Sequence, residues 1–274
     1  MRKLQTAEIR RFLVATMGVI LVFFPVYVML IAGLMSEREL HYRPPYLFPP
    51  NPTLKYYREA AETLAPYLRN SFVIAAGNVI ATLLLAPPAA FGLAKLRLKH
   101  KALITALILT LQMLPEIAAL TPIFLVWYKF GLTNTLIGVI IALACFQIPF
   151  SSLVLAVYMR SIPNELLESA YLDGASLFRL YLMIALPLSK PALATVGLLA
   201  FITAWGNLLV PLTLLQTKTL LPASVGMTTF VSSYGIQWNL LMAASALYAI
   251  GPMIIAFVAG RQLAAGLMAG ALKE

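Results

Sequence analysis

Long apolar stretches of this sequence contain a few polar or aromatic residues whose side chains suit the binding of a solute. They are Glu116, Gln147, Trp205 and Asn207. Glu116 is the only acidic residue well inside such a stretch, and a carboxylate at membrane depth is costly enough that a functional role is the default expectation. Amides and aromatic rings suit the hydroxyl groups and C–H faces of a sugar-like molecule. Gln112 is a further candidate of the same kind.

The same residues also fit structural roles. A polar partner on a companion subunit would satisfy Glu116 equally well. Trp205 fits interior packing or the aromatic belt at a membrane interface, and this is the more common use of such a residue. Both interpretations remain open at this level.

The segment 160–190 carries a second pattern, in which acidic and apolar residues alternate at helical spacing. Pro163 suits the first turn of a helix. Glu165 and Glu168 lie near its N-terminal end, where acidic side chains complement the helix dipole. Gly174 supplies the left-handed residue that ends the helix.

A second short helix should follow this glycine. Ser176 can cap its start, and Pro187 predicts that it ends just before that proline. The first helix has an apolar face at helical spacing, made of Leu166, Leu167, Ala170 and Tyr171. If the two short helices project into solvent, this apolar face should bind a protein partner. The alternative is an ordinary helical hairpin lying on the membrane surface.

Residue types that support catalysis or metal binding are scarce. Cys145 is the single cysteine, and His41 and His100 are too far apart for a usual zinc-ligand spacing. The sequence has no Gly-Lys dipeptide, which excludes a G-x-x-x-x-G-K phosphate loop. It also has no G-x-S-x-G pattern and no convincing pair of carboxylates. We therefore expect no catalytic residue, no metal site and no cofactor in this chain.

The composition indicates a membrane protein. Hydrophobic residues make up 61% of the 274 residues and charged residues only 11%, whereas a soluble domain has about 25% charged residues. This composition excludes disorder, a coiled coil, collagen and a disulfide-rich secreted domain. The net charge is +10, which in so apolar a chain is more typical of membrane topology than of nucleic-acid binding.

Six apolar runs are long enough to cross a membrane, which takes about 20 residues each. They cover residues 12–35, 71–94, 102–127, 135–159, 191–215 and 240–261. The first run is longer than the apolar part of a signal peptide, about 7–15 residues, so we expect it to be retained as a span. The sequence thus predicts an all-α, polytopic membrane protein with one transmembrane domain over residues 1–274.

Positive charge predicts the orientation of these spans. Most of the 20 Lys and Arg residues lie before the first run, between the second and third, in the segment 160–190 and after the sixth. Because cytoplasmic loops carry the excess of Lys and Arg, both termini and the segment 160–190 should be cytoplasmic. The external loop 36–67 is long, rich in Pro and Tyr, and expected to turn helical at residues 54–63. Loops of this length usually have a function or their own structure.

The cytoplasmic segment resembles the EAA loop of bacterial ATP-binding-cassette (ABC) importer permeases, in which E-A-A, three residues, G, nine residues and I-x-L-P follow in order. Here Glu168-Ser-Ala170 stands three residues before Gly174, and Ile184-Ala-Leu-Pro187 follows after nine more. Ser169 replaces the middle alanine, which is a small-for-small change. The spacing favours the protein-binding interpretation of this segment over the membrane-surface hairpin.

The resemblance covers nearly the whole chain and is closest to the second permease subunit of maltose-type sugar importers. Further matching segments are Asn70-Ser71, Ser161-Ile-Pro163 and Gly266–Lys273. One stretch departs from the family. Many members have Asn-Glu-Phe after the tryptophan of the fifth span, whereas this chain has Gly206-Asn-Leu208, which weakens the transfer of substrate detail from this region.

The resemblance implies a type I ABC importer permease fold in the bacterial or archaeal cytoplasmic (inner) membrane. Such a permease pairs with a second permease. Two cytoplasmic ATPase subunits bind ATP and Mg beneath the pair, and an extracytoplasmic binding protein delivers the sugar. The helix before Gly174 would sit in a cleft of one ATPase subunit and move the spans with it, so the chain itself would not be an enzyme. The implied coupling residues are Leu167, Glu168, Ala170, Tyr171, Asp173 and Gly174.

Other functions remain open. A family member could import another polar organic solute such as glycerol 3-phosphate, but a phosphorylated solute would want additional Arg or Lys along its path, and the middles of these spans have none. An ion-driven carrier usually places several ionisable residues at mid-membrane, whereas here only Glu116 qualifies. A membrane-embedded enzyme would need a catalytic set that the sequence lacks.

Overall fold

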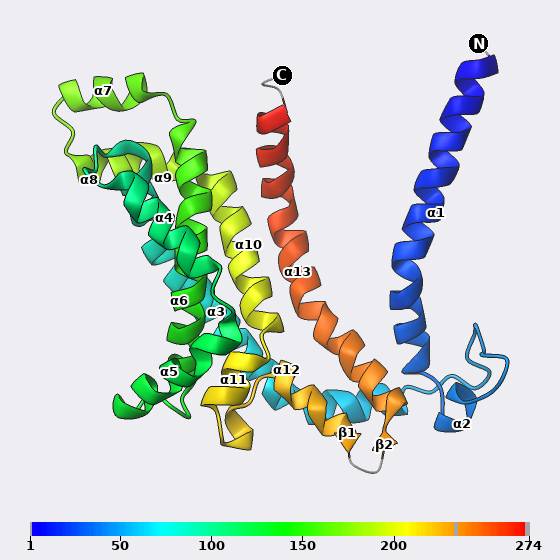
Figure 1. The fold of residues 1–274 in the computed structure, drawn as a ribbon. Helices are drawn as coiled ribbons and strands as arrows, with labels where there is room; N and C mark the ends of the chain where they lie inside the picture. Colours follow the sequence, from blue (N-terminus) through cyan, green and yellow to red (C-terminus); the bar gives the residue numbers. More distant parts are fainter. Residues whose placement is uncertain (1, 233–234, 272–274) are drawn as a thin grey trace. The chain divides into compact units, whose positions relative to one another are not determined.

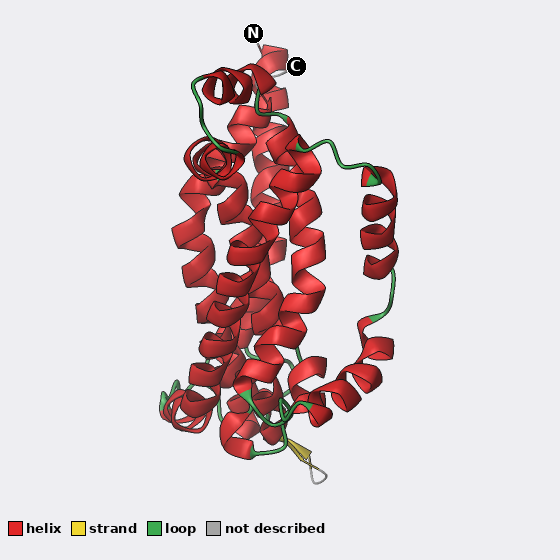
Figure 2. Cartoon of the chain, turned by 90° about the vertical axis from the view of Figure 1, so that its left-hand side faces the viewer, coloured by secondary structure: helices red, strands yellow, loops and turns green. Residues whose placement is uncertain are grey.

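A computed structural model of the chain describes residues 2–232 and 235–271, and these are almost entirely helical (Figures 1 and 2). The α-helices are α1 (Arg2–Ala32), α2 (Glu37–Leu40), α3 (Lys55–Lys95), α4 (Lys101–Gln112), α5 (Glu116–Lys129), α6 (Leu136–Arg160), α7 (Asn164–Leu172), α8 (Leu177–Leu180), α9 (Leu186–Leu188), α10 (Lys190–Gly206), α11 (Leu209–Leu214), α12 (Ala223–Gly226) and α13 (Trp238–Ala271). The all-α fold expected from the sequence is confirmed. Lys273, at the end of the last matching segment, lies outside the described residues.

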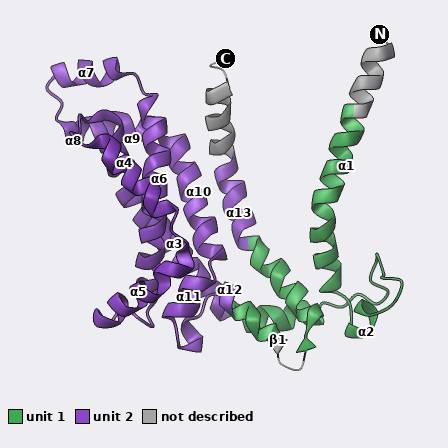
Figure 3. Cartoon of the chain, viewed as in Figure 1, with its two compact units in different colours: residues 1–65, 226–250 green, residues 66–225, 251–274 purple. Residues whose placement is uncertain are grey.

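Short irregular elements complete the chain. A π-helix covers Tyr181–Ala185, and 3₁₀ helices cover Lys218–Leu220 and Met227–Phe230. The strands β1 (Val231–Ser232) and β2 (Gly235–Ile236) pair antiparallel. The described chain forms two compact units, residues 1–65 with 226–250 and residues 66–225 with 251–274, called unit 1 and unit 2 below (Figure 3).

Four described helices are long and apolar enough to cross a membrane, namely α1, α3, α6 and α13. Two bent pairs also qualify if each is one span. The first pair is α4 with α5, bent by 97°, and the second is α8–α9 with α10, bent by 77°. The total then reaches six. Both bends therefore fall inside or beside runs that the sequence treats as single spans.

The break in the third run has a local cause. Pro115 precedes α5 with an extended backbone, φ −65° and ψ 129°. Proline has no N–H to donate, and it disfavours helical backbone in the residue before it, which favours the end of α4 ahead of Pro115. Glu116 then occupies the first turn of α5, where its carboxylate complements the positive end of the helix dipole.

The fifth run is not one helix over 191–215, which corrects the sequence prediction. Helix α10 ends at Gly206, and Asn207 is extended with φ −69° and ψ 126°. The Oδ1 atom of Asn207 accepts a hydrogen bond from the N–H of Val210 at 3.0 Å. This bond satisfies a donor at the start of α11 that has no partner within the helix. The asparagine therefore ends one helix and starts the next.

The helical part of the external loop is also longer than predicted. Instead of stopping near residue 63, it continues without interruption into the second run as the 41-residue helix α3. Three prolines lie within this helix, at positions 66, 87 and 88. No glycine lies between residues 55 and 76, so this stretch lacks the left-handed residue that most often ends a helix.

Unit 1 is organised around the junction of α1 with the external loop. The hydroxyl of Tyr57 donates to the carbonyl of Leu30 at 2.9 Å, which ties α3 to the end of α1. Glu39 accepts hydrogen bonds from the backbone N–H and the hydroxyl of Ser36, each at 2.8 Å, and from Nδ2 of Asn51 at 3.1 Å. The two Ser36 bonds, above all, hold the pKa of Glu39 below its ordinary value, because they favour the charged form.

Unit 2 is built around α6, which packs against α4, α10 and α11. Its buried side includes Leu155 and Met159, which belong to a core that also contains Ala86, Ala90 and Val196. Small residues on α3 let the helices approach closely, as is usual where helices meet in a membrane protein.

Gly251 is required by the packing of Trp205. A Cβ atom at Gly251 would lie 2.4 Å from Cζ2 of the tryptophan ring, which is closer than atoms can approach. The Trp205 ring is 5% exposed and stacks on Phe201 at a centroid distance of 5.4 Å. It therefore has little room to move aside.

We predict that Gly251→Ala lowers the melting temperature of the purified protein in detergent, with a cost of about 1–3 kcal/mol from overpacking. Gly260→Ala in the same helix is the matched control, because no atom lies within 4 Å of the added methyl group. Alanine is the better helix former, so the control should melt at the same temperature or higher. Equal melting temperatures for the two variants would contradict this packing role.

Candidate functional site

Helix α7 lies at one end of unit 2, close to α8, while α5 and α11 lie at the opposite end (Figure 1). The helix ends as predicted, because Gly174 has φ +85°. The N–H of Gly174 donates to the carbonyl of Tyr171, and the N–H of Ala175 donates to that of Ala170, both at 3.0 Å. This pair of bonds is a Schellman motif, which satisfies carbonyl groups at the helix end. Ser176 then caps α8 through its hydroxyl, as expected.

The apolar face of α7 is divided between two surroundings, which corrects the prediction of a single free face. Leu167 is buried and belongs to the core of unit 2, and Ala170 packs against the same core. Leu166 and Tyr171 are exposed, together with Leu172 at 86%. The reason is that adjacent residues point about 100° apart around a helix, so Leu167 and Ala170, three apart, share the face toward the core while Leu166 and Tyr171 point away from it.

The acidic residues of this end and the glycine of the turn are exposed. Glu168, Asp173 and Gly174 all lie on the solvent side. Of the predicted coupling residues, Glu168, Tyr171, Asp173 and Gly174 are therefore accessible to another protein. Leu167 and Ala170 hold the helix in place instead.

Lys95, one of the basic residues between the second and third apolar runs, fixes the start of α7. Its Nζ atom donates to the carbonyl of Ile162 at 2.6 Å and to Oδ1 of Asn164 at 2.8 Å. The last residue of α3 is thereby bonded to the first residue of α7. No pattern in the sequence indicates this contact, because positions 95 and 164 come together only in the folded chain.

The sequence predicts that the helix after Ser176 ends just before Pro187. In the structure it does not end there. It continues from α8 through the π-helix Tyr181–Ala185 into α9, which contains Pro187 and ends at Leu188. A π-helix bonds residues five apart, so it shifts the hydrogen-bond register ahead of the proline, whose missing N–H then falls at the start of α9. The bend to α10 follows at Ser189.

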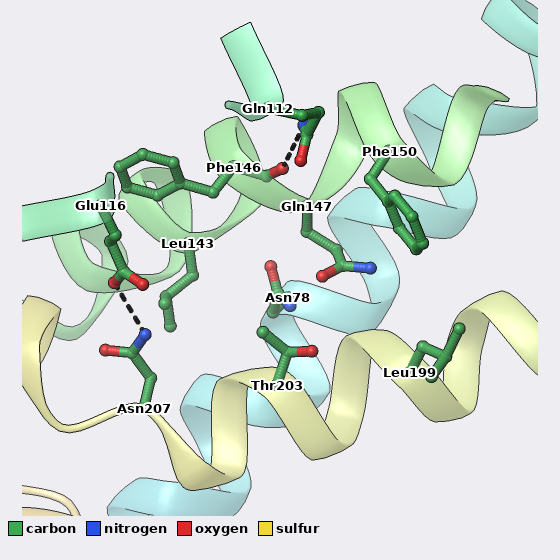
Figure 4. Close-up of a pocket in the computed structure, with 10 residues that line it drawn as sticks. All are labelled: Asn78, Gln112, Glu116, Leu143, Phe146, Gln147, Phe150, Leu199, Thr203 and Asn207. Carbon is green, nitrogen blue, oxygen red and sulfur yellow. Dashed lines mark hydrogen bonds between the residues drawn. The ribbon is translucent and has the colours of Figure 1, made fainter. Parts of the chain in front are cut away.

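A second candidate site is a cavity of about 250 Å³ inside unit 2 (Figure 4). It lies among α3, α6 and α10, beside the break between α4 and α5. Its lining consists of Asn78, Gln112, Glu116, Leu143, Phe146, Gln147, Phe150, Leu199, Thr203 and Asn207. Three of the four predicted solute-path residues, Glu116, Gln147 and Asn207, therefore come together here, with Gln112.

Asn207 and Glu116 are bonded to each other across this cavity (Figure 4). The Nδ2 atom of Asn207 donates to Oε1 of Glu116 at 2.8 Å. The backbone carbonyl of Asn207 accepts from the hydroxyl of Ser224, also at 2.8 Å. The structural interpretation of Glu116 assumed a polar partner on a companion subunit. The carboxylate has a polar partner within its own chain.

The other amides of the cavity are held in different ways. Gln147 donates to the hydroxyl of Ser151 at 3.0 Å, and Gln112 donates to the carbonyl of Phe146 at 3.2 Å. Asn78 donates from Nδ2 to the carbonyl of Ala200 at 2.9 Å. Its Oδ1 atom is buried and has no hydrogen-bond partner among the described residues. Asn78 and Thr203 were not singled out from the sequence, because Asn and Thr occur in many spans without a role.

Trp205 is not among the residues that line the cavity. It is buried between Phe201 and Gly251 in the packing described above. The structure thus assigns this residue to packing rather than to the cavity wall. Among the described residues, no group of three His, Cys, Asp or Glu residues is placed to hold a metal ion.

Comparison with known proteins gives a consistent result. Residues 86–267 match the family described as the binding-protein-dependent transport system inner membrane component. The sulfoquinovosyl glycerol transport system permease protein SmoH of Agrobacterium fabrum is 30% identical over 265 residues, which is 96% of this chain and 93% of that protein. The trehalose/maltose transport system permease protein MalG of Thermococcus litoralis is 33% identical over 208 residues, covering 76% and 75% of the two chains.

A solved structure has the same fold. It is a bacterial ABC transporter involved in the import of the acidic polysaccharide alginate, and one of its chains superposes with a TM-score of 0.80 at 20% sequence identity. The match covers 96% of this chain and 98% of that one. Together with the apolar helices, these findings place the chain in the inner membrane as a multi-pass protein, and it belongs to the family of binding-protein-dependent transport system inner membrane components.

Proposed function

We propose that this chain is the permease subunit of an ABC importer that moves a sugar or oligosaccharide across the cytoplasmic membrane. Helix α7 is the observation that supports this most, because it presents Glu168 and Tyr171 to solvent and ends in a rigid glycine turn. The chain has no phosphate loop of its own, so an exposed helix fixed to the spans is a suitable contact for an ATPase. The names of the two relatives support a carbohydrate as the solute.

The proposal includes the rest of the complex. A second permease would complete the path, and two cytoplasmic ATPase subunits would bind ATP and Mg, so that this chain needs no cofactor and performs no catalysis. An extracytoplasmic solute-binding protein would deliver the sugar, in agreement with the family description. Glu116, Gln147 and Asn207 would belong to the solute path, and the packing of Trp205 makes it a support for α10 rather than a contact.

The contacts of α7 suggest how force would reach the spans. Leu167 packs into the core of unit 2, and Lys95 bonds the start of α7 to the end of α3. A displacement of the exposed face of α7 would therefore move the end of α3 with it. Such rigid transmission needs a stiff helix end, and the two bonds of the Gly174 turn supply it.

We predict that Gly174→Val reduces sugar-stimulated ATP hydrolysis by the reconstituted complex about five- to thirtyfold, because a side chain in left-handed backbone costs about 1–2 kcal/mol. The added Cβ meets no atom within 4 Å, so the loss would come from the backbone alone. Gly174→Asn is the matched control, since asparagine tolerates this conformation and should lose much less. Copurification of the ATPase subunit and normal stimulated hydrolysis in the valine variant would refute the coupling role of α7.

We predict that Lys95→Met lowers the amount of sugar transported per ATP hydrolysed by several-fold, because it removes the bonds from α3 to the first residue of α7 and to Ile162 just before it, while keeping the apolar stem. The complex should still assemble, since Leu167 remains packed. Lys99→Met removes an exposed lysine from the same turn and serves as the control. Transport and hydrolysis are measured together in proteoliposomes, and equal ratios for the two variants would show that this contact does not transmit force.

A further inference from the structure

The polar groups of the cavity form a set suited to hydroxyl groups rather than to charges. They comprise four amides, one hydroxyl and one carboxylate, from Asn78, Gln112, Gln147, Asn207, Thr203 and Glu116. Two phenyl rings, those of Phe146 and Phe150, complete the wall (Figure 4). No Lys, Arg or His is among these lining residues. Amides both donate and accept, so they match hydroxyl groups, which do the same.

Asn78 supplies an acceptor that the described protein leaves unused. Its side chain is 1% exposed, and its Oδ1 atom has no partner among the described residues. A buried acceptor without a donor is costly, and structures rarely leave one in place. Its amide nitrogen is already engaged by Ala200, which fixes the side chain with the oxygen available. Figure 4 shows that oxygen on the side of Gln147. A hydroxyl group of a bound molecule would satisfy it.

Glu116 gives the cavity a negative charge with spare capacity to accept hydrogen bonds. Only its Oε1 atom receives a hydrogen bond from the described part of the chain, from Asn207. The Oε2 atom can therefore accept from a second donor. A hydroxyl group can donate to this oxygen, whereas a second carboxylate nearby would be repelled, and no cation lines the cavity to offset that repulsion.

The volume limits the size of the occupant. Pockets for drug-sized ligands measure about 300–1,000 Å³, and this one measures about 250 Å³. It has room for a single sugar ring, with the phenyl groups against the C–H faces. A longer chain would have to extend beyond it.

We propose that this cavity is a subsite for one neutral sugar unit, in which Glu116 selects against acidic sugars. The inference rests on the proposed function, and adds to it the position of a solute site in this subunit and the charge of the solute it accepts. Asn78 and Thr203 join the predicted residues as contacts for hydroxyl groups. Asn207 positions the Glu116 carboxylate.

The test uses the complete transporter in proteoliposomes, with a neutral disaccharide that it transports and the matching disaccharide in which one sugar is oxidised to its uronic acid. Transport is measured for both, and the ratio of their kcat/KM values is the readout. In Glu116→Gln the amide oxygen can still accept from Asn207, so the local structure should be retained. We expect the preference for the neutral sugar to fall at least tenfold, because the substitution removes the negative charge that repels the uronic acid.

Thr203→Lys provides a second and independent change, because Thr203 is exposed and tolerates a longer side chain. A cation in the cavity should also shift the ratio toward the acidic sugar. Glu62→Gln is the matched control, since it removes an exposed carboxylate in unit 1, outside the cavity lining. It should leave the ratio unchanged.

The outcomes separate this inference from the proposed function. If the complex hydrolyses ATP in response to the neutral sugar but neither Glu116→Gln nor Thr203→Lys changes the ratio, the cavity is not a subsite and the importer assignment stands. If Glu62→Gln changes the ratio as much as Glu116→Gln, selection occurs elsewhere and the inference is overturned. If no sugar stimulates hydrolysis or transport by the wild-type complex, the proposed function fails and the subsite with it.

Discussion

Two apolar runs of unit 2 are broken, and the hydrogen bond between Asn207 and Glu116 joins the two breaks. A helix that stops in an apolar environment leaves backbone groups that need partners. Asn207 meets part of this need, because its Oδ1 atom accepts from the N–H of Val210 and its own carbonyl accepts from the hydroxyl of Ser224. Because one residue ties the two interruptions together, the space between them has fixed polar walls instead of collapsing onto apolar side chains.

The opposite end of unit 2 depends on a different kind of connection. There the short helix α7 lies flat, with Leu167 in the core and its other face in solvent. Lys95 adds a direct bond from α3 to Asn164, the first residue of α7. One helix, α3, therefore connects the cavity with α7, since it carries Asn78 at the cavity and Lys95 at the start of α7. A shift of α3 would therefore move both Asn78 and Lys95.

Much of this arrangement follows from the sequence, and the exceptions have a common cause. Hydrophobic runs and the spacing around Gly174 predict the helices and the left-handed turn, because both are local properties of the chain. Three of the four residues chosen for a solute path line the cavity, since polar groups in apolar runs must face something polar. The packing partner of Trp205 and the contacts of Lys95 and Asn78 could not be predicted, because they are defined by neighbours more than 40 residues away in sequence.

Two glycines described above are constrained in opposite ways. At position 251 the limit is volume, because the tryptophan ring occupies the space that any side chain would need. At position 174 the surroundings are empty, and only the sign of the backbone angle restricts the residue. A D-amino acid prefers that angle, so D-alanine would fit there while L-alanine is strained. The turn after α7 is therefore constrained by the handedness of its backbone. The volume of a side chain at position 174 would be limited only by a surface that packs against the turn.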